Sequence, residues 1–266
     1  MNAGECPPVA RIGPVSNLYW TGGVLGRMIR HPRWRRVMSS SYGQFCPVSM
    51  AAEVVCSRWT MLVVREMLCG STRFNDLRRG VPRMSPALLS KRLKELEQAG
   101  IVRVEPTGQP GINDYRLTRA GEELRGLVEG LGTWGQRWVE SNLSLKNLDP
   151  SLLMWDMRRR VDPKSFPPGR TVVHFHYPEL DEERQDWWLV VADGTVDLCL
   201  HDPGYDVDLE LRAPLRVMTA IWMGHCSLRA EMAAGTLEAH GPPALVRSIS
   251  TWLGLSSFAP IKREVA

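Results

Sequence analysis

Residues 84–102, with the sequence MSPALLSKRLKELEQAGIV, restrict the possible folds of this chain more than any other segment. Ser85 followed by Pro86 is the pattern of a helix N-cap and a first helical residue, and Gly100 is typical of a helix end. The segment therefore predicts a helix that starts at Ser85 and runs to Gly100.

This predicted helix has two chemically different faces. Three leucines recur at the period of an α-helix and share one face, which must pack against a core: Leu89, Leu93 and Leu96. A second stripe, at i, i+3, i+4 and i+7, is narrow, small and positive: Ala87, Ser90, Lys91 and Lys94. The first face predicts a buried side, and the second a side that meets a partner or solvent.

The segments around this helix predict a helix-turn-helix followed by a hairpin. Residues 47–55 and 57–70 are apolar helical runs, and residues 73–82, RFNDLRRGVP, indicate one short helix stopped by glycine and proline. Two short helices joined by a tight link are typical of a helix-turn-helix. Next, IVRVE (101–105) and DYRLT (114–118) are β-type segments separated by the turn-rich PTGQPGIN, which predicts a β-hairpin wing.

In a helix-turn-helix, the second helix enters the major groove of DNA, where short side chains near its N-terminus approach base edges. Ser90 and Lys91 are accordingly the predicted base-edge contacts. The arginines and the other lysine are predicted phosphate contacts, which supply affinity rather than sequence choice. Each of them taken singly is equally well explained by a solvated helical face. The predicted DNA-binding residues of these helices are Arg73, Arg78, Arg79, Ser85, Ala87, Ser90, Lys91, Arg92 and Lys94.

Residues 119–141, RAGEELRGLVEGLGTWGQRWVES, predict a longer amphipathic helix. Its apolar residues recur at helical spacing: Leu124, Leu127, Val128, Leu131, Trp134 and Trp138. Four glycines beyond its first turn, Gly126, Gly130, Gly132 and Gly135, each cost up to about 1 kcal/mol relative to alanine, so this helix would be weak in isolation. We therefore expect packing to hold it, in particular packing against a second copy of the chain.

The chain of 266 residues is long enough for about two domains, and its 44% hydrophobic residues are typical of a globular protein. Its charge is uneven: residues 46–140 hold 14 basic and 11 acidic residues, and residues 141–266 hold 13 and 17. Residues 1–37 hold six arginines against one acid. They are predicted to be a loose basic extension, or an arm that touches the DNA backbone.

No apolar run reaches the roughly 18 residues of a membrane span. The first 20 residues are broken by proline and glycine, unlike a signal peptide. The six cysteines show neither a CxxC pair nor the spacing of zinc ligands. We therefore expect a protein of the reducing cytoplasm without a membrane partner.

Residues 142–170 predict a linker that carries a helix, and residues 171–262 predict a second domain of the α+β class. The strand-like segments TVVHFHY, WWLVV, TVDLCL and DVDLEL precede the helical segments APLRVMTAIWMG, SLRAEMAAG and PPALVRSISTWLG. Alternation puts apolar residues of two strands on one face: Val196, Leu198, Leu200, Val207, Leu209 and Leu211. A sheet with one buried side follows.

Residues 46–140 resemble the HxlR-type winged-helix regulators of bacteria. The resemblance rests on CPVSMAAEVVCSRWTMLVVREMLCGSTRFNDLRRGVPRMSPALLSKRLKELEQAGIV, DYRLTRAGEEL and WGQRW, in that order. It implies a DNA-binding and dimerisation domain over residues 38–141. It also implies a homodimer on a double-stranded DNA operator with two half-sites, in which the first helix and the long last helix form the dimer interface.

The resemblance has further implications for the wing tip and for Cys46. The wing tip, TGQPGIN, lacks the basic residue often found there in the family, so Gln109 and Asn113 are the predicted phosphate contacts of the wing. Cys46 matches a thiol-sensor position of redox-responsive members, and a thiolate at a helix start is reactive. Other members carry the same cysteine without that role, and a free cysteine is usually a small buried hydrophobic residue.

Residues 150–262 resemble sterol carrier protein type lipid-binding domains. The resemblance rests on DVDLEL, a helix ending at Gly224, GTLEAHG and a last amphipathic helix. It implies a sheet covered by helices around an apolar tunnel, which suits a fatty or sterol-like effector. The residues expected near the tunnel are Met218, Ile221, Trp222, Ile249, Trp252, Leu255 and Phe258. An ordinary core between helices and sheet explains the same residues equally well.

His174 and His176 project from one side of a predicted strand, as a metal-binding pair would. With no carboxylate or cysteine at close spacing, solvent-facing histidines without a metal are the prediction. The chain has no GxSxG nucleophile elbow and no glycine-rich phosphate loop. We therefore expect neither enzymatic activity nor a cofactor.

Together these patterns predict a dimeric DNA-binding transcriptional regulator whose C-terminal domain binds an apolar small molecule and thereby changes operator affinity. One alternative is a repressor that senses oxidants through Cys46 and has a purely structural C-terminal domain. Another is a lipid carrier that retains a repurposed winged helix.

Overall fold

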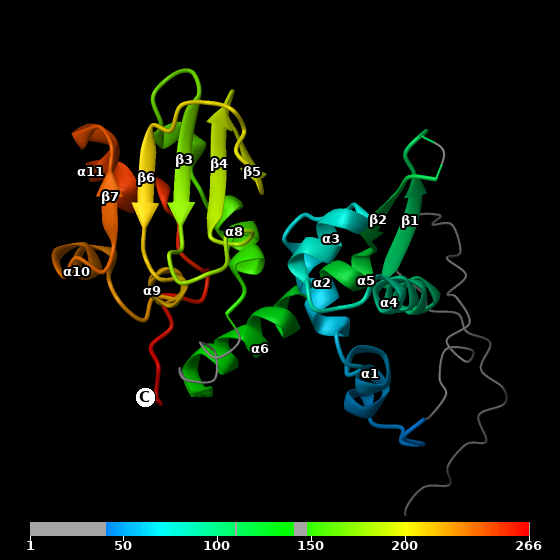
Figure 1. The fold of residues 1–266 in the computed structure, drawn as a ribbon. Helices are drawn as coiled ribbons and strands as arrows, with labels where there is room; N and C mark the ends of the chain where they lie inside the picture. The colour runs from blue at the N-terminus through cyan, green and yellow to red at the C-terminus, as the bar shows by residue number, and fades with distance from the viewer. Residues whose placement is uncertain (1–40, 110, 141–147, 266) are drawn as a thin grey trace, which may run out of the picture.

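The fold has two parts that follow each other along the chain (Figure 1). The computed structural model describes residues 41–109, 111–140 and 148–265. The predicted basic extension, 1–37, lies outside the described residues. So do residues 141–147, which include the start of the predicted linker, and Pro110 of the predicted wing.

The first part is a winged helix. Its elements are α1 (Pro47–Val55), α2 (Thr60–Leu68), α3 (Phe74–Gly80), α4 (Pro86–Gln98), β1 (Val102–Pro106), β2 (Asn113–Leu117), α5 (Arg119–Glu122) and α6 (Arg125–Trp138). α3 and α4 form the helix-turn-helix, and β1 pairs antiparallel with β2 to form the wing. The predicted helix-turn-helix and hairpin are confirmed.

α4 starts and stops as its sequence predicts. The Ser85 hydroxyl accepts a hydrogen bond from the backbone N–H of Leu88 (3.3 Å), and Pro86 is the first helical residue. Beyond the helix, Gly100 turns the chain with a φ of +69°, which glycine adopts without strain. The inner face is at most 2% exposed and packs in the core of the winged helix, as expected for Leu89, Leu93 and Leu96.

The predicted long helix over 119–141 is divided in the structure, so that prediction is wrong in part. α5 ends at Glu122 and α6 begins at Arg125. The Thr118 hydroxyl caps α5 by accepting from the Gly121 N–H, and it donates to the Gly100 carbonyl (2.6 Å). The first turn is thereby tied to the base of the wing. The helix is interrupted at Leu124, whose N–H bonds to the Gly121 carbonyl three residues back (3.1 Å) rather than four residues back.

Apolar side chains lie exposed on both outer helices of the winged helix. Around α1, Phe45, Val48 and Met50 are 98%, 75% and 57% exposed. On α6 the exposed apolar residues share one side at helical spacing: Leu127, Leu131, Trp134 and Trp138. Within the described part of the chain, no single helix is long and apolar enough to cross a membrane, and only α1 and α2 together, bent by 82°, have the length and composition.

The second part is of the predicted α+β class, but it begins before the predicted boundary at residue 171, because α8 of the predicted linker (142–170) packs in its core. Its elements are α8 (Pro150–Arg158), the short 3-10 helix η2 (Pro163–Ser165), β3 (Thr171–His176), β4 (Asp186–Ala192), β5 (Thr195–Cys199), β6 (Leu209–Arg212), α9 (Leu215–Trp222), α10 (Leu228–Ala233), β7 (Glu238–His240) and α11 (Pro243–Trp252). The strands form one sheet in the order β5-β4-β3-β6-β7. β3 and β6 are parallel, and the other neighbouring pairs are antiparallel.

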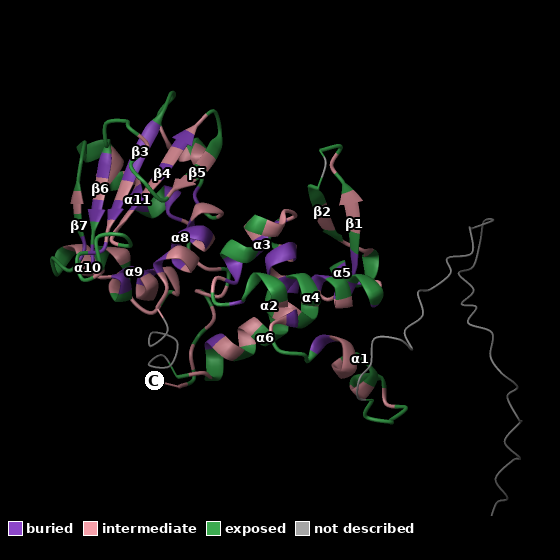
Figure 2. Ribbon diagram, turned by 45° about the vertical axis from the view of Figure 1, so that its right-hand side comes forward, coloured by how far each residue is buried: buried purple, intermediate pink, exposed green. Residues whose placement is uncertain are grey.

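One face of this sheet is buried under helices (Figure 2). Residues of α8, α9 and α11 share a hydrophobic core with the inward residues of the strands. This core includes Met154, Met218 and Trp252 from the three helices, and Phe175 and Leu189 from the strands. The predicted buried side of the sheet is therefore present. Of the six residues assigned to it, Leu209 and Leu211 are buried, and Val196 and Leu198 are half-buried against the core. Leu200 follows the end of β5 and is 51% exposed, and Val207 precedes β6 and is 44% exposed.

The C-terminal tail returns to α6 and connects the two parts. Gly132 of α6 lies against the ring of Phe258, because a Cβ at Gly132 would be 2.2 Å from the Phe258 Cζ. The Gln136 side chain donates to the Met223 carbonyl (3.0 Å), and Arg263 donates to the Gln136 carbonyl (3.3 Å). Close approach of the tail therefore explains one of the four glycines of α6.

Alanine substitutions in α6 separate helix propensity from tail packing. Gly135→Ala adds a methyl group with no atom within 4 Å, so it should raise the free energy of unfolding by about 0.5–1 kcal/mol. Gly132→Ala should lower it, because its new Cβ collides with the Phe258 ring. Denaturant unfolding followed by circular dichroism measures both, and equal stabilisation by the two substitutions would contradict the tail contact.

Candidate nucleic-acid interface

The positive stripe of α4 lies on the surface of the winged helix. Ala87, Ser90, Lys91 and Lys94 are all exposed, on the side of α4 away from the buried leucines. Neither lysine has an ion-pair partner among the described residues. The stripe therefore presents two free ammonium groups and a hydroxyl on one side of a rigid helix.

The predicted arginine contacts differ in how free they are. Arg78 is exposed and has no ion-pair partner in the described part of the chain. Arg73 pairs with an aspartate of β2 (2.9 Å), and Arg79 pairs with an aspartate of its own helix (3.2 Å). Arg92 pairs with Glu95 within α4, and its side chain is only 14% exposed. Of these four arginines, only Arg78 could bind a phosphate without first breaking an ion pair with a carboxylate.

The wing carries two arginines that sequence analysis missed. Arg103 of β1 and Arg116 of β2 lie directly opposite each other, and their side chains are 56% and 45% exposed. Both form ion pairs with Glu105, which offsets the repulsion between opposed like charges. Apolar and polar residues alternate in IVRVE and DYRLT, and this pattern could have predicted that both arginines point outward. The predicted wing contacts, Gln109 and Asn113, are exposed.

A buried carboxylate joins the winged helix to the second domain. Glu66 of α2 is 0% exposed. Arg159, at the end of α8, forms an ion pair with it, and the Trp155 indole N–H donates to its Oε1 (2.8 Å). From the winged helix, the Ser71 hydroxyl (2.9 Å) and the Arg65 guanidinium (3.2 Å) reach the same carboxylate. Because a buried charge without partners is very unfavourable, these contacts favour one docked arrangement of the two parts.

We refer to Glu66, Trp155 and Arg159 as the domain junction. The Trp155 ring is 3% exposed, and three guanidinium groups lie 4.3–5.2 Å from its centroid: Arg158, Arg159 and Arg79. Burial and the neighbouring Arg65 lower the pKa of Arg159 to about 10, so it remains charged at neutral pH. At Gly80 a Cβ would lie 1.9 Å from the Glu66 carboxyl carbon, so the end of α3 also needs glycine to approach the junction.

Sequence analysis missed this junction. A glutamate in the apolar run TMLVVREML signalled a buried carboxylate, and the arginine-rich end of α8 signalled its partner. Nothing in the linear sequence joins these segments, which lie 93 residues apart. Arg79, predicted to contact phosphate, also lies over the Trp155 ring, with its guanidinium carbon 5.2 Å from the ring centroid.

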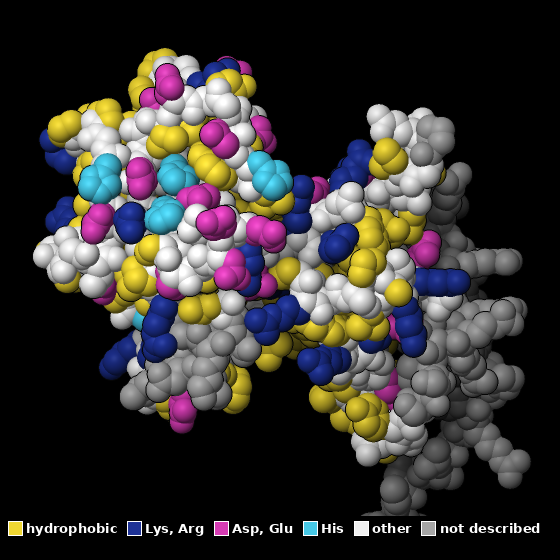
Figure 3. Space-filling model, viewed as in Figure 1, with side chains coloured by type: hydrophobic (Ala, Val, Ile, Leu, Met, Phe, Trp, Pro, Cys, Tyr) yellow, Lys and Arg dark blue, Asp and Glu magenta, His cyan; other side chains and the backbone are white. Residues whose placement is uncertain are grey.

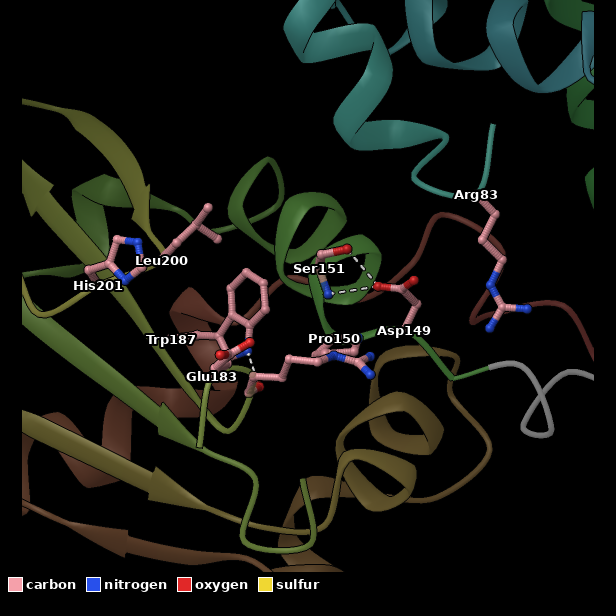
Figure 4. A pocket seen from close by; sticks show the side chains of 9 residues that line it. Arg83, Asp149, Pro150, Ser151, Glu183, Trp187, Leu200 and His201 are labelled. Carbon is pink, nitrogen blue, oxygen red and sulfur yellow. Dashed lines mark hydrogen bonds between the residues drawn. The ribbon is translucent and has the colours of Figure 1, made fainter. Parts of the chain in front are cut away.

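A cleft of about 510 Å³ lies between the two parts (Figure 4). It is lined by Arg83 before α4, by the start of α8 and by the sheet domain: Arg83, Asp149, Pro150, Ser151, Glu183, Arg184, Trp187, Leu200 and His201. The Asp149 carboxylate caps α8 by accepting from the Ser151 N–H (3.0 Å) and hydroxyl (2.6 Å). The lining of the cleft includes several charged side chains and therefore differs from the apolar tunnel that the sequence predicts.

The predicted tunnel residues lie elsewhere, mainly in the core of the second domain. Four of them are at most 1% exposed: Met218, Ile221, Ile249 and Trp252. Trp222 is half-buried at the edge of that core, Leu255 is 40% exposed, and Phe258 packs on α6. One atom stands out, because the buried Trp252 indole N–H has no hydrogen-bond partner among the described residues.

Cys46 lies at the start of α1, as predicted. It is the N-cap residue of that helix and is partly exposed, and its side chain makes no capping hydrogen bond. Its carbonyl accepts from the Met50 N–H (3.1 Å). The thiol is therefore held at a helix N-terminus, where oxidants can reach it.

Comparisons with known proteins place similarity in the first part of the chain. A family model described as HxlR-like helix-turn-helix matches residues 54–143. The HTH-type transcriptional regulator YvaP of Bacillus subtilis is 31% identical over 99 residues, which cover 36% of this chain and 92% of YvaP. YybR of the same organism is 35% identical over 92 residues, covering 34% of this chain and 74% of YybR.

Other matches span less of the relative, or are known from structures. The regulator Rv3095 of Mycobacterium tuberculosis is 39% identical over 95 residues, which cover 35% of this chain and only 58% of Rv3095. The solved structure of the redox regulator HypR in its reduced form is 33% identical with a TM-score of 0.33, covering 34% of this chain and 91% of HypR. The curated relatives are transcriptional regulators, which are not enzymes.

Removing the junction carboxylate should destabilise the protein. Glu66→Ala leaves Arg159 buried without its partner, so it should lower the free energy of unfolding by about 3–5 kcal/mol. Adding Arg159→Leu should recover much of that loss, because both buried charges are then gone. Denaturant unfolding of the two variants tests this, with Glu97→Ala, an exposed glutamate of α4, as the control. No difference between Glu66→Ala and Glu97→Ala would contradict the role of the junction.

Proposed function

The chain belongs to the HxlR-like helix-turn-helix family of transcriptional regulators, and we propose that it binds a double-stranded DNA operator as a homodimer. The exposed positive stripe of α4 carries this proposal. An α-helix fits the major groove of B-DNA, and short side chains near its N-terminus come closest to the base edges. Ser90 and Lys91 are the proposed base-edge contacts, with Ala87 close enough for apolar contact.

The phosphate backbone is the proposed partner of the surrounding cations. Lys94 and Arg78 are exposed, and among the described residues neither forms an ion pair, so they reach phosphates at no cost in broken ion pairs. The Ser85 hydroxyl keeps its proton for a phosphate while it caps α4. Arg73, Arg79 and Arg92 would have to exchange a carboxylate for a phosphate, so we expect them to contribute less. On the wing, Gln109, Asn113, Arg103 and Arg116 are the proposed contacts.

Lys91→Ala tests whether α4 is the helix that reads the DNA sequence. It should weaken binding to the operator about 5- to 100-fold and flatten the discrimination against a mismatched base pair. Lys164→Ala removes the same charge from an exposed lysine of the second domain and should leave binding almost unchanged. Fluorescence anisotropy at fixed salt measures both, and equal losses for the two variants would refute α4 as the reading helix.

The exposed apolar residues of α1 and α6 support the proposed dimer. Phe45 just before α1, Val48 within it, and the leucine and tryptophan side of α6 are exposed apolar side chains, and apolar surface gathered in this way is typical of a protein interface. The other side of α6 is occupied by Phe258 and Met223 of the same chain. One side of α6 is therefore left for a second copy.

Leu131→Asp tests this interface. A carboxylate in the apolar side of α6 should shift the protein from dimer to monomer at micromolar concentration, because the charge would be buried without a partner. Leu200→Asp introduces the same charge at a leucine of similar exposure, 51% against 56%, and should not change the mass. Sedimentation equilibrium gives the answer, and a dimer that survives Leu131→Asp would exclude this side of α6.

The second domain is the proposed regulatory part. A sterol carrier type domain with an apolar effector between its sheet and its helices α9 and α11 remains the proposed reading. The buried Trp252 indole N–H, without an acceptor in the described part of the chain, supports it because the polar end of such an effector would supply one. An effector acts only if it binds one conformation of the dimer better than the other, and the domain junction provides the contact through which α8 would move α2 and α3.

A thiol switch at Cys46 is the second proposed mode of regulation. Its support is the partly exposed position of the thiol at the start of α1, close to the proposed dimer interface. Cys46→Ser separates the two modes, because loss of an oxidant response with retention of ligand response assigns the switch to the thiol. The alternative of a lipid carrier whose winged helix no longer binds DNA would be excluded if the protein gave a defined footprint on DNA.

A further inference from the structure

The open face of the second domain's sheet carries two imidazoles and a carboxylate. His174 and His176 point to this face from β3, and Asp186 begins β4 directly opposite His176. The Asp186 Oδ1 lies 2.8 Å from the His174 Nε2 and 2.7 Å from the His176 Nδ1. Solvent-facing histidines without a close carboxylate were predicted, but the β3–β4 hairpin brings in an aspartate from ten residues further along the chain.

We propose that His174, His176 and Asp186 bind a divalent transition-metal ion, with Zn²⁺ as the expected metal. One ligand atom from each residue lies within 4.8 Å of the other two. Zinc binds imidazole nitrogen and carboxylate oxygen at about 2.0–2.2 Å, so neighbouring ligands of a tetrahedral site are about 3.3 Å apart. Small side-chain rotations that open the two aspartate–histidine contacts by about half an ångström would admit the ion.

The three side chains are held in place before any metal arrives. They are 16%, 18% and 26% exposed, whereas His240 on the edge strand β7 is 63% exposed. The Trp188 ring stacks on His174 with a centroid distance of 5.0 Å and an interplanar angle of 18°. Fixed ligands lose little conformational entropy on binding, which favours a defined site over loose capture by surface histidines.

The charges around the cluster suit a cation. The register places Glu210 beside His174 and Arg212 beside His176, and Glu238 of β7 lies across from Arg212. Figure 3 shows the histidines of this face among acidic side chains. Of these three register neighbours, two are acidic and only Arg212 is basic, so the local charge favours a bound cation.

Three protein ligands on an open sheet face leave at least one coordination position for water or an external ligand. This distinguishes the cluster from a closed structural site. Binding needs neither DNA nor a second copy of the chain, because all three ligands come from one hairpin. The inference is therefore independent of the proposed operator binding.

Metal titration of the full chain tests the proposal. After removal of any affinity tag and treatment with EDTA, Zn²⁺ is titrated calorimetrically, and Co²⁺ is titrated as a spectroscopic probe. The expected result is one Zn²⁺ per chain that is bound by this cluster. His176→Ala and Asp186→Asn should each weaken that binding at least tenfold, whereas His240→Ala should leave it unchanged. The Co²⁺ complex should show d–d bands without thiolate charge transfer, which excludes the free cysteines as ligands.

Asp186→Asn keeps the size of the side chain and an acceptor for the histidines, so loss of binding there does not reflect loss of fold. Circular dichroism of each variant without metal checks this directly. Zn²⁺ binding that is absent from the wild-type chain, or that survives both His176→Ala and Asp186→Asn, would overturn the site. Thiolate charge transfer would assign the metal to cysteines instead and would equally overturn it.

Discussion

The ion pair between Glu66 and Arg159 is the interaction on which the arrangement of the two domains depends. A carboxylate inside the winged helix is stable only if a cation and hydrogen-bond donors reach it, and two of these come from α8. Two residues of α3 also lie at this junction. Gly80 leaves room for the Glu66 carboxylate, and the Arg79 guanidinium lies over the Trp155 ring. The helix-turn-helix is therefore packed directly against the second domain rather than merely linked to it.

A continuous chain of contacts joins the interior of the second domain to the core that holds α4. The Tyr177 hydroxyl contacts the Met154 sulfur (3.0 Å), and Met154 neighbours Trp155 in α8. α8 holds Glu66 of α2, and α2 and α3 share a core with α4. For this route to regulate, α8 must have two discrete positions that an effector distinguishes. The C-terminal tail on α6 supplies a second contact, beside the proposed dimer interface.

Local patterns in the sequence predicted the local structure well. The Ser-Pro start and the leucine period of α4, the turn-rich wing and the alternating strands of the sheet each depend on neighbouring residues. Contacts between residues far apart along the chain were not predicted. The Thr118 hydroxyl donates to the Gly100 carbonyl at the base of the wing, and Arg79 lies over the ring of a tryptophan 76 positions away along the chain. The aspartate between the two histidines and the partner of Glu66 were hidden for the same reason.

The proposed function of the winged helix depends on the reading of a DNA sequence by α4. The most direct measurement is fluorescence anisotropy of the full protein with a labelled duplex from its own upstream region, beside a scrambled duplex of the same composition, at physiological salt. If α4 reads the sequence, the upstream duplex should bind at least 100-fold tighter than the scrambled one, with affinity falling steeply as salt rises. Equal affinity for both duplexes would contradict it, because charge alone would then explain the binding.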